Sequence, residues 1–450
     1  AGDLITIFVF WELMAVSSTI IVWSARTATA YRASLRYMLV HIFGGVVLMV
    51  GIVAHVADTG SIAFVAMQPE TLGTWLILIG FLINAGAPPM SAWLPDAYPE
   101  ASWSGAVFLS AFTTKTAVFV LIVGFPGADI LIWVGVYMIF YGIIYALLEN
   151  DMRRILAYSI INQVGFMVCG IGIGTELAIN GAASHAFAHI IYKALLLMSA
   201  GSVLYATGKR KCTDLGGLFQ SMPLTTICGI IGALAISSFP LTSGFISKSM
   251  ISSAAADQHM AFIWFMLTAA SAGVFLHAGI KFPWFVFFQK DSGLRPPDPP
   301  WNMRAAMVVF AALCIGLGVW PEPLYAILPY PVDYVPYTAG HVIQMLQLLL
   351  FAGLAFFLLL PFMKRTLTIS LDFDWLYRRL LPLCVRAFLA IFGPVDRCVR
   401  AVFMGSVKNT IARVYRYAGP NGPLARSAQA GSMVYWAVSL LVVYLVLYLA

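Results

Sequence analysis

Long apolar runs separated by short polar segments dominate the chain from end to end. A transmembrane helix needs about 20 predominantly apolar residues to cross the hydrocarbon core of a bilayer. The apolar runs predict twelve spans: Leu4–Ser24, Leu35–Ala57, Leu72–Trp93, Ser104–Gly124, Ile130–Leu148, Ile155–Gly174, Ala178–Ala206, Pro223–Ala256, Ala261–Phe288, Ala305–Leu328, Val342–Phe362 and Met433–Leu449. Strand-period alternation is absent, so the pattern predicts an all-α polytopic membrane protein and excludes an outer-membrane barrel.

Composition agrees with this prediction and excludes a soluble protein. Hydrophobic residues make up 61% of the 450 residues and charged residues only 10%, whereas soluble domains carry about 25% charged residues. The six cysteines show no C-x-x-C spacing, so we expect core residues and neither a metal site nor a disulfide framework. Because Ala1 opens directly into a span that carries Glu12, with no basic leader, we expect a chain that lacks its natural start.

Charges in the loops predict the orientation. Alternate loops on one face hold eight acidic residues and no lysine or arginine, while the other face holds eleven basic residues against seven acids. The positive-inside rule places the basic face in the cytoplasm. We therefore expect a multi-pass protein of the cell inner (plasma) membrane with this face inside.

The segment 364–432 differs from the rest because it is basic and amphipathic. It holds eleven lysines and arginines against three acids, so its charge of +8 exceeds the formal +7 of the whole chain. Apolar residues recur at helical spacing, and we expect Pro382, Pro394 and the Pro-Asn-Gly-Pro run at 420–423 to break the segment into pieces. It is predicted to lie along the cytoplasmic interface before a final span at 433–450; a basic linker is the alternative. Either suits a lipid bilayer or a neighbouring subunit better than nucleic acid.

Five ionisable residues remain inside spans: Glu12, Lys115, Lys193, Lys248 and Lys281. A charged side chain at the bilayer centre costs at least about 2.5–3.5 kcal/mol, so such residues usually mark ion or proton pathways. Burial favours the neutral form of lysine, which lets a buried lysine take up and release protons. Glu12 and Lys281 lie near span ends and have a structural alternative, in which they reach the interface or form a static pair.

His185, His189 and Lys193 recur at every fourth position within one span. This spacing drifts by only about 40° over eight residues of a helix, so the three side chains share one face. A zinc site is the competing interpretation, but it lacks a third ligand nearby, and the lysine would repel a cation. The row therefore favours a proton relay with no metal and no cofactor.

Two spans contain helix-breaking sequences. The first is interrupted by Asn84 and the Pro88-Pro89 pair, and the second by Pro240 and Gly244. Each broken span is the third of a five-span block, and paired broken spans in corresponding places are typical of inverted-repeat transporters. A static kink is the alternative. We therefore expect a first inverted repeat at 1–125, a second at 126–290 and additional spans at 291–363.

Several of these residues also belong to motifs. The motifs are Gly2–Leu4 leading into Phe8–Glu12, Trp93–Ala97, Asp151–Ser159, His185–Leu196 and Phe239–Lys248. Their combination resembles the antiporter-like membrane subunits of respiratory complex I, and most of all the D-type subunit of the Mrp-type multisubunit monovalent cation/proton antiporters. The resemblance covers about residues 2–330.

The resemblance implies a proton half-channel in each repeat, joined by a central hydrophilic axis. It implies that Glu12 is the glutamate of the first repeat, Lys115 the central lysine and Lys248 the terminal lysine. His185, His189 and Lys193 would connect them. It also implies about four further spans before residue 1 and a lateral helix formed by the basic segment. His41 and Lys281 remain further candidates.

One position departs from the family pattern. Asn84 stands where the family usually has a lysine that pairs with the glutamate, and an amide cannot take up a proton. We expect a proton-translocating subunit of a cation/proton antiporter, with companion subunits, that exchanges protons for Na+ or another monovalent cation. The alternatives are the proton-pumping arm of a quinone- or hydrogenase-linked oxidoreductase, with redox chemistry on other subunits, and a non-conducting structural subunit.

Overall fold

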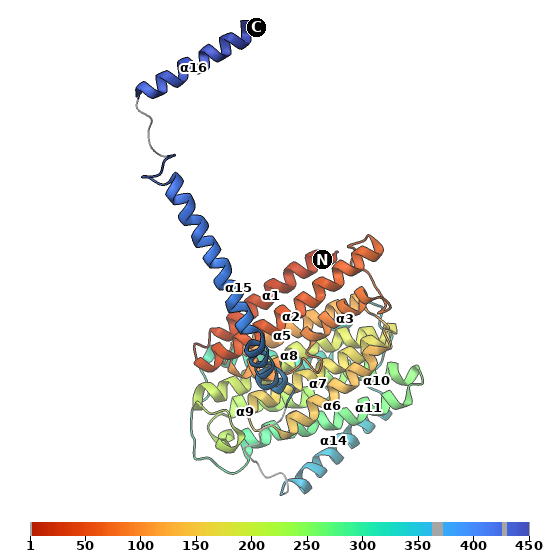
Figure 1. The fold of residues 1–450 in the computed structure, drawn as a ribbon. Helices are drawn as coiled ribbons and strands as arrows, with labels where there is room; N and C mark the ends of the chain where they lie inside the picture. Colours follow the sequence, from red (N-terminus) through yellow and green to blue (C-terminus); the bar gives the residue numbers. More distant parts are fainter. Residues whose placement is uncertain (1, 362–371, 425–429, 450) are drawn as a thin grey trace. The chain divides into compact units, whose positions relative to one another are not determined.

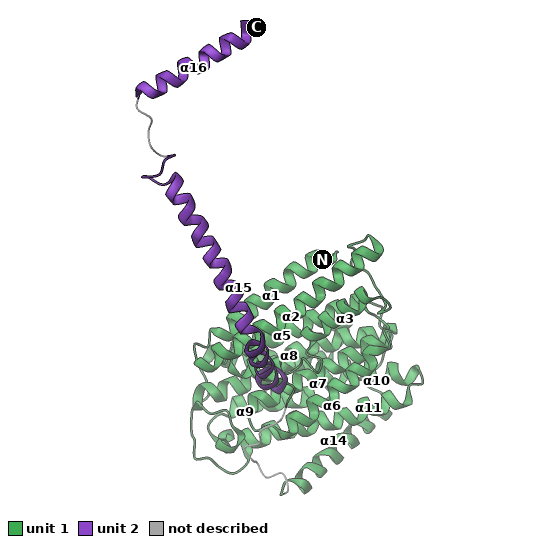
Figure 2. Cartoon of the chain, in the orientation of Figure 1, with its two compact units in different colours: residues 1–374 green, residues 375–450 purple. Residues whose placement is uncertain are grey.

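The computed structural model describes residues 2–361, 372–424 and 430–449, and in these ranges every named element is a helix (Figure 1). The chain divides into two compact units, residues 1–374 and 375–450 (Figure 2). These observations confirm the predicted all-α class. The basic residues Lys364, Arg365 and Arg426 of the segment 364–432 lie outside the described residues.

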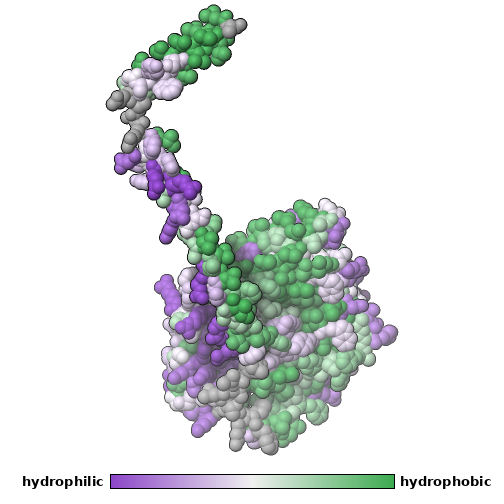
Figure 3. All heavy atoms as spheres, viewed as in Figure 1, coloured by the Kyte–Doolittle hydropathy of each residue, from purple (hydrophilic) through white to green (hydrophobic). Residues whose placement is uncertain are grey.

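Ten helices of the described residues are long and apolar enough to cross a membrane, which confirms a multi-pass membrane protein. They are α1 Leu4–Trp23, α2 Ala28–Thr59, α5 Gly105–Gly124, α6 Ile130–Leu148, α7 Met152–Ile173, α8 Glu176–Thr207, α11 Ala261–Val274 with the π-helical turns Phe275–Lys281 and Trp284–Phe288, α12 Trp301–Val319, α14 Ala339–Leu359 and α16 Ala430–Leu449. On the face of unit 1 drawn in Figure 3, hydrophobic side chains form a broad band and hydrophilic ones gather toward the helix ends.

The two broken spans are each divided into two helices. The first consists of α3 Leu72–Ala85 and the short α4 Trp93–Ala97, and the second of α9 Pro223–Ile236 and α10 Ser243–Asp257. In the first break, Gly86 has a φ of 80°, and the indole Nε1 of Trp93 donates to the carbonyl of Ile83 at 3.1 Å. The indole adds to the bond that the Ile83 carbonyl accepts from the backbone N–H of Gly86 at 3.1 Å, so this carbonyl at the break has its partners inside the protein, as a backbone inside a membrane requires.

Capping residues explain where several helices begin and end. The Asp3 carboxylate accepts from the backbone N–H of Thr6 at 2.7 Å, and the Thr175 hydroxyl accepts from that of Ala178 at 3.2 Å. Both bonds satisfy N–H groups that have no partner inside the helix. At the other end of α8, Gly208 adopts a φ of 67°, a conformation that suits glycine and ends the helix.

Helix α7 is the core of unit 1, because all its residues except Arg154 are buried. Close packing against α6 depends on glycine: a Cβ at Gly142 would meet the backbone of Tyr158 and Asn162 at 2.7 Å. The carboxylate of Asp372 also lies against these helices, where it accepts hydrogen bonds from the hydroxyls of Tyr141 and Tyr158. Asp372 is buried, so it fixes the last described stretch of unit 1 to its core.

Two predictions about helix boundaries are wrong. The predicted span Ala305–Leu328 ends earlier, at Val319, because Pro321 lacks an N–H and disfavours a helical residue before it; a single turn, α13 Glu322–Tyr325, follows. Pro382 and Pro394 do not break the basic segment, since α15 runs unbroken from Leu381 to Ala418. Pro382 lies in the first turn of α15, where a missing N–H is harmless. Within unit 2, α15 and the run at 420–423 come before α16.

Candidate functional site

The row on α8 lies in the interior of unit 1. His185, His189 and Lys193 are each fully buried. The Nδ1 atom of His185 lies 2.9 Å from the hydroxyl of Ser247 on α10, and its Nε2 atom lies 3.3 Å from the hydroxyl of Tyr192. The ring centroids of His185 and His189 are 6.3 Å apart. Both nitrogens of His189 are buried and have no hydrogen-bond partner among the described residues.

The ammonium groups of Lys193 and Lys248 donate to hydroxyl and carbonyl oxygens and not to carboxylates. Lys193 Nζ donates to the hydroxyl of Ser159 at 2.9 Å and to the carbonyl of Leu156 at 3.3 Å. Lys248 Nζ donates to the carbonyl of Ile236 at 2.7 Å and lies 4.8 Å from the centre of the Phe166 ring. Ile236 is the last residue of α9, so Lys248 satisfies a carbonyl that the second break exposes.

Lys115 joins this group from α5. Its Nζ atom donates to the carbonyl of Ser110 at 2.8 Å and to the hydroxyl of Thr114 at 3.1 Å. The charges of Lys115, Lys193 and Lys248 all act on His189, so the three ammonium groups lie within electrostatic range of one imidazole. The structure therefore brings five of the sequence candidates together; we name Lys115, His185, His189, Lys193 and Lys248 the relay cluster.

Sequence reasoning missed the polar side chains that support the relay cluster. Tyr192 donates from its hydroxyl to Gln163 Oε1 at 3.0 Å, and Gln163 in turn donates to Asn162 on α7. His277 lies close enough to Lys193, Lys248 and Lys281 for their charges to act on it, and its side chain is fully buried. The four-residue spacing of His277 and Lys281, the same as that of His189 and Lys193, is a sequence signal that could have identified it.

Lys281 has the environment of a structural residue. Its Nζ atom donates to the carbonyls of Ala146, Leu147 and Glu149, at 3.0, 2.6 and 2.6 Å. These carbonyls belong to the end of α6 and the residue that follows it. A cation at this position satisfies carbonyls that have no partner in the helix, which is the static arrangement that the sequence left open.

Glu12 is not among the residues of the relay cluster; it lies on α1, and its carboxylate faces α2. A Cβ atom at Gly45 would overlap its carboxylate, so the carboxylate packs directly on the backbone of α2. Its Oε1 atom is buried and has no hydrogen-bond partner among the described residues. Glycine at position 45 is therefore what admits this carboxylate.

The predicted helix-breaking residues lie in or beside the two breaks. Asn84 is buried in the last turn of α3, and Pro88 and Pro89 lie in the break that follows. Pro240 lies in the second break, where Ser238 and Leu241 have φ values of 60° and 69°. Gly244, in the first turn of α10, lies so close to α9 that a Cβ would overlap the carbonyl of Ala235.

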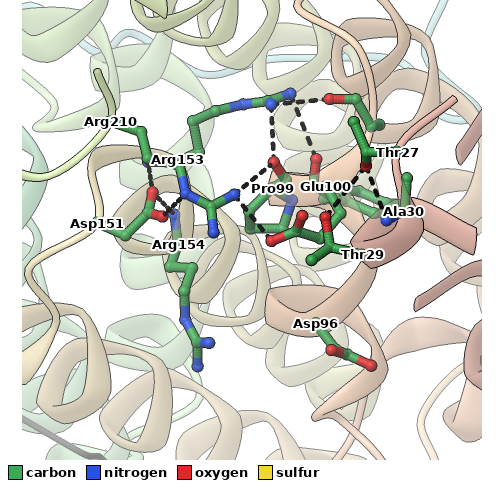
Figure 4. Close-up of polar contacts among 12 residues, drawn as sticks. Thr27, Thr29, Ala30, Asp96, Pro99, Glu100, Asp151, Arg153, Arg154 and Arg210 are labelled. Carbon is green, nitrogen blue, oxygen red and sulfur yellow. Dashed lines mark hydrogen bonds and ion pairs between the residues drawn. The ribbon is translucent and has the colours of Figure 1, made fainter. Parts of the chain in front are cut away.

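A charge network links the segment that follows α4 to the start of α7 (Figure 4). Arg153 donates to the carbonyls of Pro99 at 2.7 Å, Ala101 at 2.8 Å and Ser102 at 2.9 Å. Arg210 pairs with Glu100 and with Asp151, both at 2.8 Å. Burial raises the pKa of the Asp151 carboxyl, and the Arg210 charge opposes this shift. Loops that the sequence assigned to one face therefore meet at one end of the bundle; we name Glu100, Asp151, Arg153 and Arg210 the Arg153 network.

A metal centre is not indicated by the donor atoms. Among the described residues, no group of three or more histidine, cysteine, aspartate or glutamate side chains could hold a metal ion. The two histidines of the relay cluster have lysines as neighbours, which disfavours a bound cation. The cluster instead combines groups that take up and release protons.

Several known proteins are similar to this chain in sequence and in fold. The family described as NADH:quinone oxidoreductase/Mrp antiporter, transmembrane, matches residues 1–273. The D-type subunit of the Na+/H+ antiporter of Alkalihalophilus pseudofirmus is 30% identical over 347 residues, which cover 72% of this chain and 70% of that protein. The Mrp complex of a Dietzia species contains a similar fold, with a TM-score of 0.65 at 22% identity over 72% of each chain. The archaeal membrane-bound sulfane sulfur reductase, a respiratory membrane complex, contains a chain with a TM-score of 0.68 at 26% identity; the match covers 99% of this chain and 81% of that one.

Proposed function

We propose, since the chain belongs to the NADH:quinone oxidoreductase/Mrp antiporter transmembrane family, that it translocates protons as a subunit of a multisubunit monovalent cation/proton antiporter. The relative from Alkalihalophilus pseudofirmus, a subunit of an Na+/H+ antiporter, supports this function. Na+ or another monovalent cation would be exchanged, and other subunits of the membrane complex would be its partners.

The observation that carries the proposal is the relay cluster. It places three lysines and two histidines within electrostatic reach of one another, inside spans and away from bulk water. Imidazole accepts a proton on one nitrogen and releases it from the other, and a buried ammonium releases a proton readily because burial disfavours its charge. A proton entering at Lys115 is thus passed through His189 and Lys193 or His185 to Lys248. Ser159, Ser247 and Tyr192 orient the donors along this path.

The proposed division into repeats follows from the two breaks. Residues 1–125 form the first inverted repeat and residues 126–290 the second, with additional spans at 291–363. Asn84 lies before the first break, in α3, and Lys248 lies after the second, in α10, so the two broken spans carry different chemistry. The relay cluster joins Lys115 of the first repeat to the row on α8 of the second.

The proposed orientation places the Arg153 network on the cytoplasmic side of a plasma (inner) membrane. The basic excess of this face supports the assignment through the positive-inside rule. Residues 364–432 lie on the same side in the proposal. Their arginines suit the anionic lipids of the cytoplasmic leaflet or an acidic surface of a companion subunit.

A second function is a proton-pumping membrane subunit of a redox-driven complex. It is favoured by the match to the sulfane sulfur reductase complex, which extends over 99% of this chain, whereas the match to the Mrp complex covers 72%. In that case the redox centres lie on other subunits, and the relay cluster performs the same proton transfer.

Transport by the whole complex in sealed vesicles separates the two functions. We expect an imposed Na+ gradient to drive a pH change inside the vesicles without any electron donor, and Lys248→Ala to remove the change. Lys290→Ala, at an exposed loop position, is the matched control and should transport like the wild type. A pH change that requires an electron donor would instead support the redox-driven pump.

A further inference from the structure

The first repeat holds a buried histidine that the relay cluster does not use. We propose that His41 is the proton-exchanging partner of Glu12 and passes protons between Glu12 and Lys115, the role that Asn84 cannot perform. This inference rests on the proposed proton translocation and adds the entry path to it.

Geometry on α2 brings the two groups together. The Glu12 carboxylate packs on Gly45, and His41 precedes Gly45 by four residues. Residues four apart share one face of a helix at a separation of about 5–6 Å. The carboxylate therefore lies one helical turn from the position of His41 on the same face of α2, with one carboxylate oxygen buried and unpaired among the described residues. An unpaired buried oxygen of this kind calls for a proton or a donor.

The neighbours of the His41 imidazole are two aromatic rings and an amide. Its ring lies 4.1 Å from that of Tyr37 and 4.6 Å from that of Trp93, measured between centroids. Its side chain is 1% exposed and lies near the Asn84 amide, and neither ring nitrogen has a hydrogen-bond partner among the described residues. An amide takes up no proton, so of these two neighbouring side chains only His41 changes protonation.

Hydroxyl groups continue the path toward the relay cluster. Tyr37, whose ring is tilted by 40° against that of His41, donates from its hydroxyl to Ser18 at 3.0 Å and lies beside the Thr113 hydroxyl. Thr114, the next residue on α5, accepts a hydrogen bond from Lys115. Hydroxyls both donate and accept, so each accepts a proton on one side and releases one on the other. One proton thus leaves the Glu12 carboxyl, passes the His41 imidazole and reaches Lys115, with no net change in the intermediate groups.

The test is Na+-driven proton flux in vesicles that hold the whole complex, with the assembled complex quantified in each sample. We expect His41→Gln, which keeps the polarity but not the titration, to lower the flux at least about tenfold. His55→Gln, at a half-buried position of the same helix, is the control and should leave the flux unchanged. Adding Asn84→Lys to His41→Gln should restore flux, because lysine supplies a titratable group near this position.

The outcomes separate this inference from the proposed function. Equal flux in His41→Gln and His55→Gln, with flux lost in Lys248→Ala, would overturn the role of His41 but not the proposed function. Failure of Asn84→Lys to restore flux in an assembled His41→Gln complex would also overturn the role of His41, because that result would mean that His41 acts through packing and not through titration. Unchanged flux in Lys248→Ala would overturn the proposed function, and this inference with it.

Discussion

Replacing Lys193 with methionine is expected to lower proton flux through the complex at least about tenfold while leaving the complex assembled. Lys193 is fully buried, and its ammonium is held by Ser159 and the carbonyl of Leu156. Methionine fills a similar volume with a flexible apolar chain, so the packing of α8 against α7 is retained. What disappears is the titratable group next to His189. Proton uptake by vesicles that hold the whole complex measures the effect.

Two further substitutions sharpen this prediction. Lys193→Arg keeps a positive charge but does not release a proton in the working pH range, so it should lose flux as Lys193→Met does. Lys209→Met, at an exposed position after α8, should retain flux. Full transport by Lys193→Arg would mean that Lys193 supplies only charge and would contradict its place in a relay.

Arg153→Ala is expected to lower the free energy of unfolding by about 3 kcal/mol or more. The guanidinium is 3% exposed and donates to four carbonyls, those of Tyr98, Pro99, Ala101 and Ser102. Removing it leaves these buried acceptors without their donor, and the cost of an unpaired buried group exceeds the net gain of a typical hydrogen bond. The midpoint of thermal unfolding of the purified complex in detergent should fall clearly.

Arg32→Ala is the control for this prediction, because Arg32 is an exposed arginine near the same end of the bundle. It should change the midpoint little. An Arg153→Ala protein as stable as Arg32→Ala would show that the Arg153 network does not hold the segment after the first break against α7. Loss of flux without loss of stability would instead assign Arg153 a part in transport.

Local sequence was enough to predict the helices, the two breaks and the row on α8. A run of about 20 apolar residues has few alternatives in a membrane. Proline within such a run removes a backbone donor, so the breaks after Asn84 and before Gly244 follow from the sequence. The row needs only the helical period, since His185, His189 and Lys193 lie on a single helix. Pro394 does not end α15, contrary to the expectation from sequence, because an exposed helix can bend around a proline instead of ending.

Contacts between helices could not be predicted, because they depend on which faces meet. Nothing in the spacing shows that Gly45 admits the Glu12 carboxylate or that His41 lies near Asn84. Lys281 is an ionisable residue in a span by sequence, yet its three carbonyl partners belong to residues more than 130 positions earlier in the chain. Packing thus decides which partners each buried charge has, and the spacing of residues along the chain does not show them.

We propose that protons cross unit 1 through the relay cluster. Lys115 and Lys248, at the two ends of this path, offer the most direct test. Lys115→Ala and Lys248→Ala should each reduce ion-driven proton flux in vesicles that hold the whole assembled complex to the level of vesicles without the complex. Unchanged flux in both variants would contradict the relay.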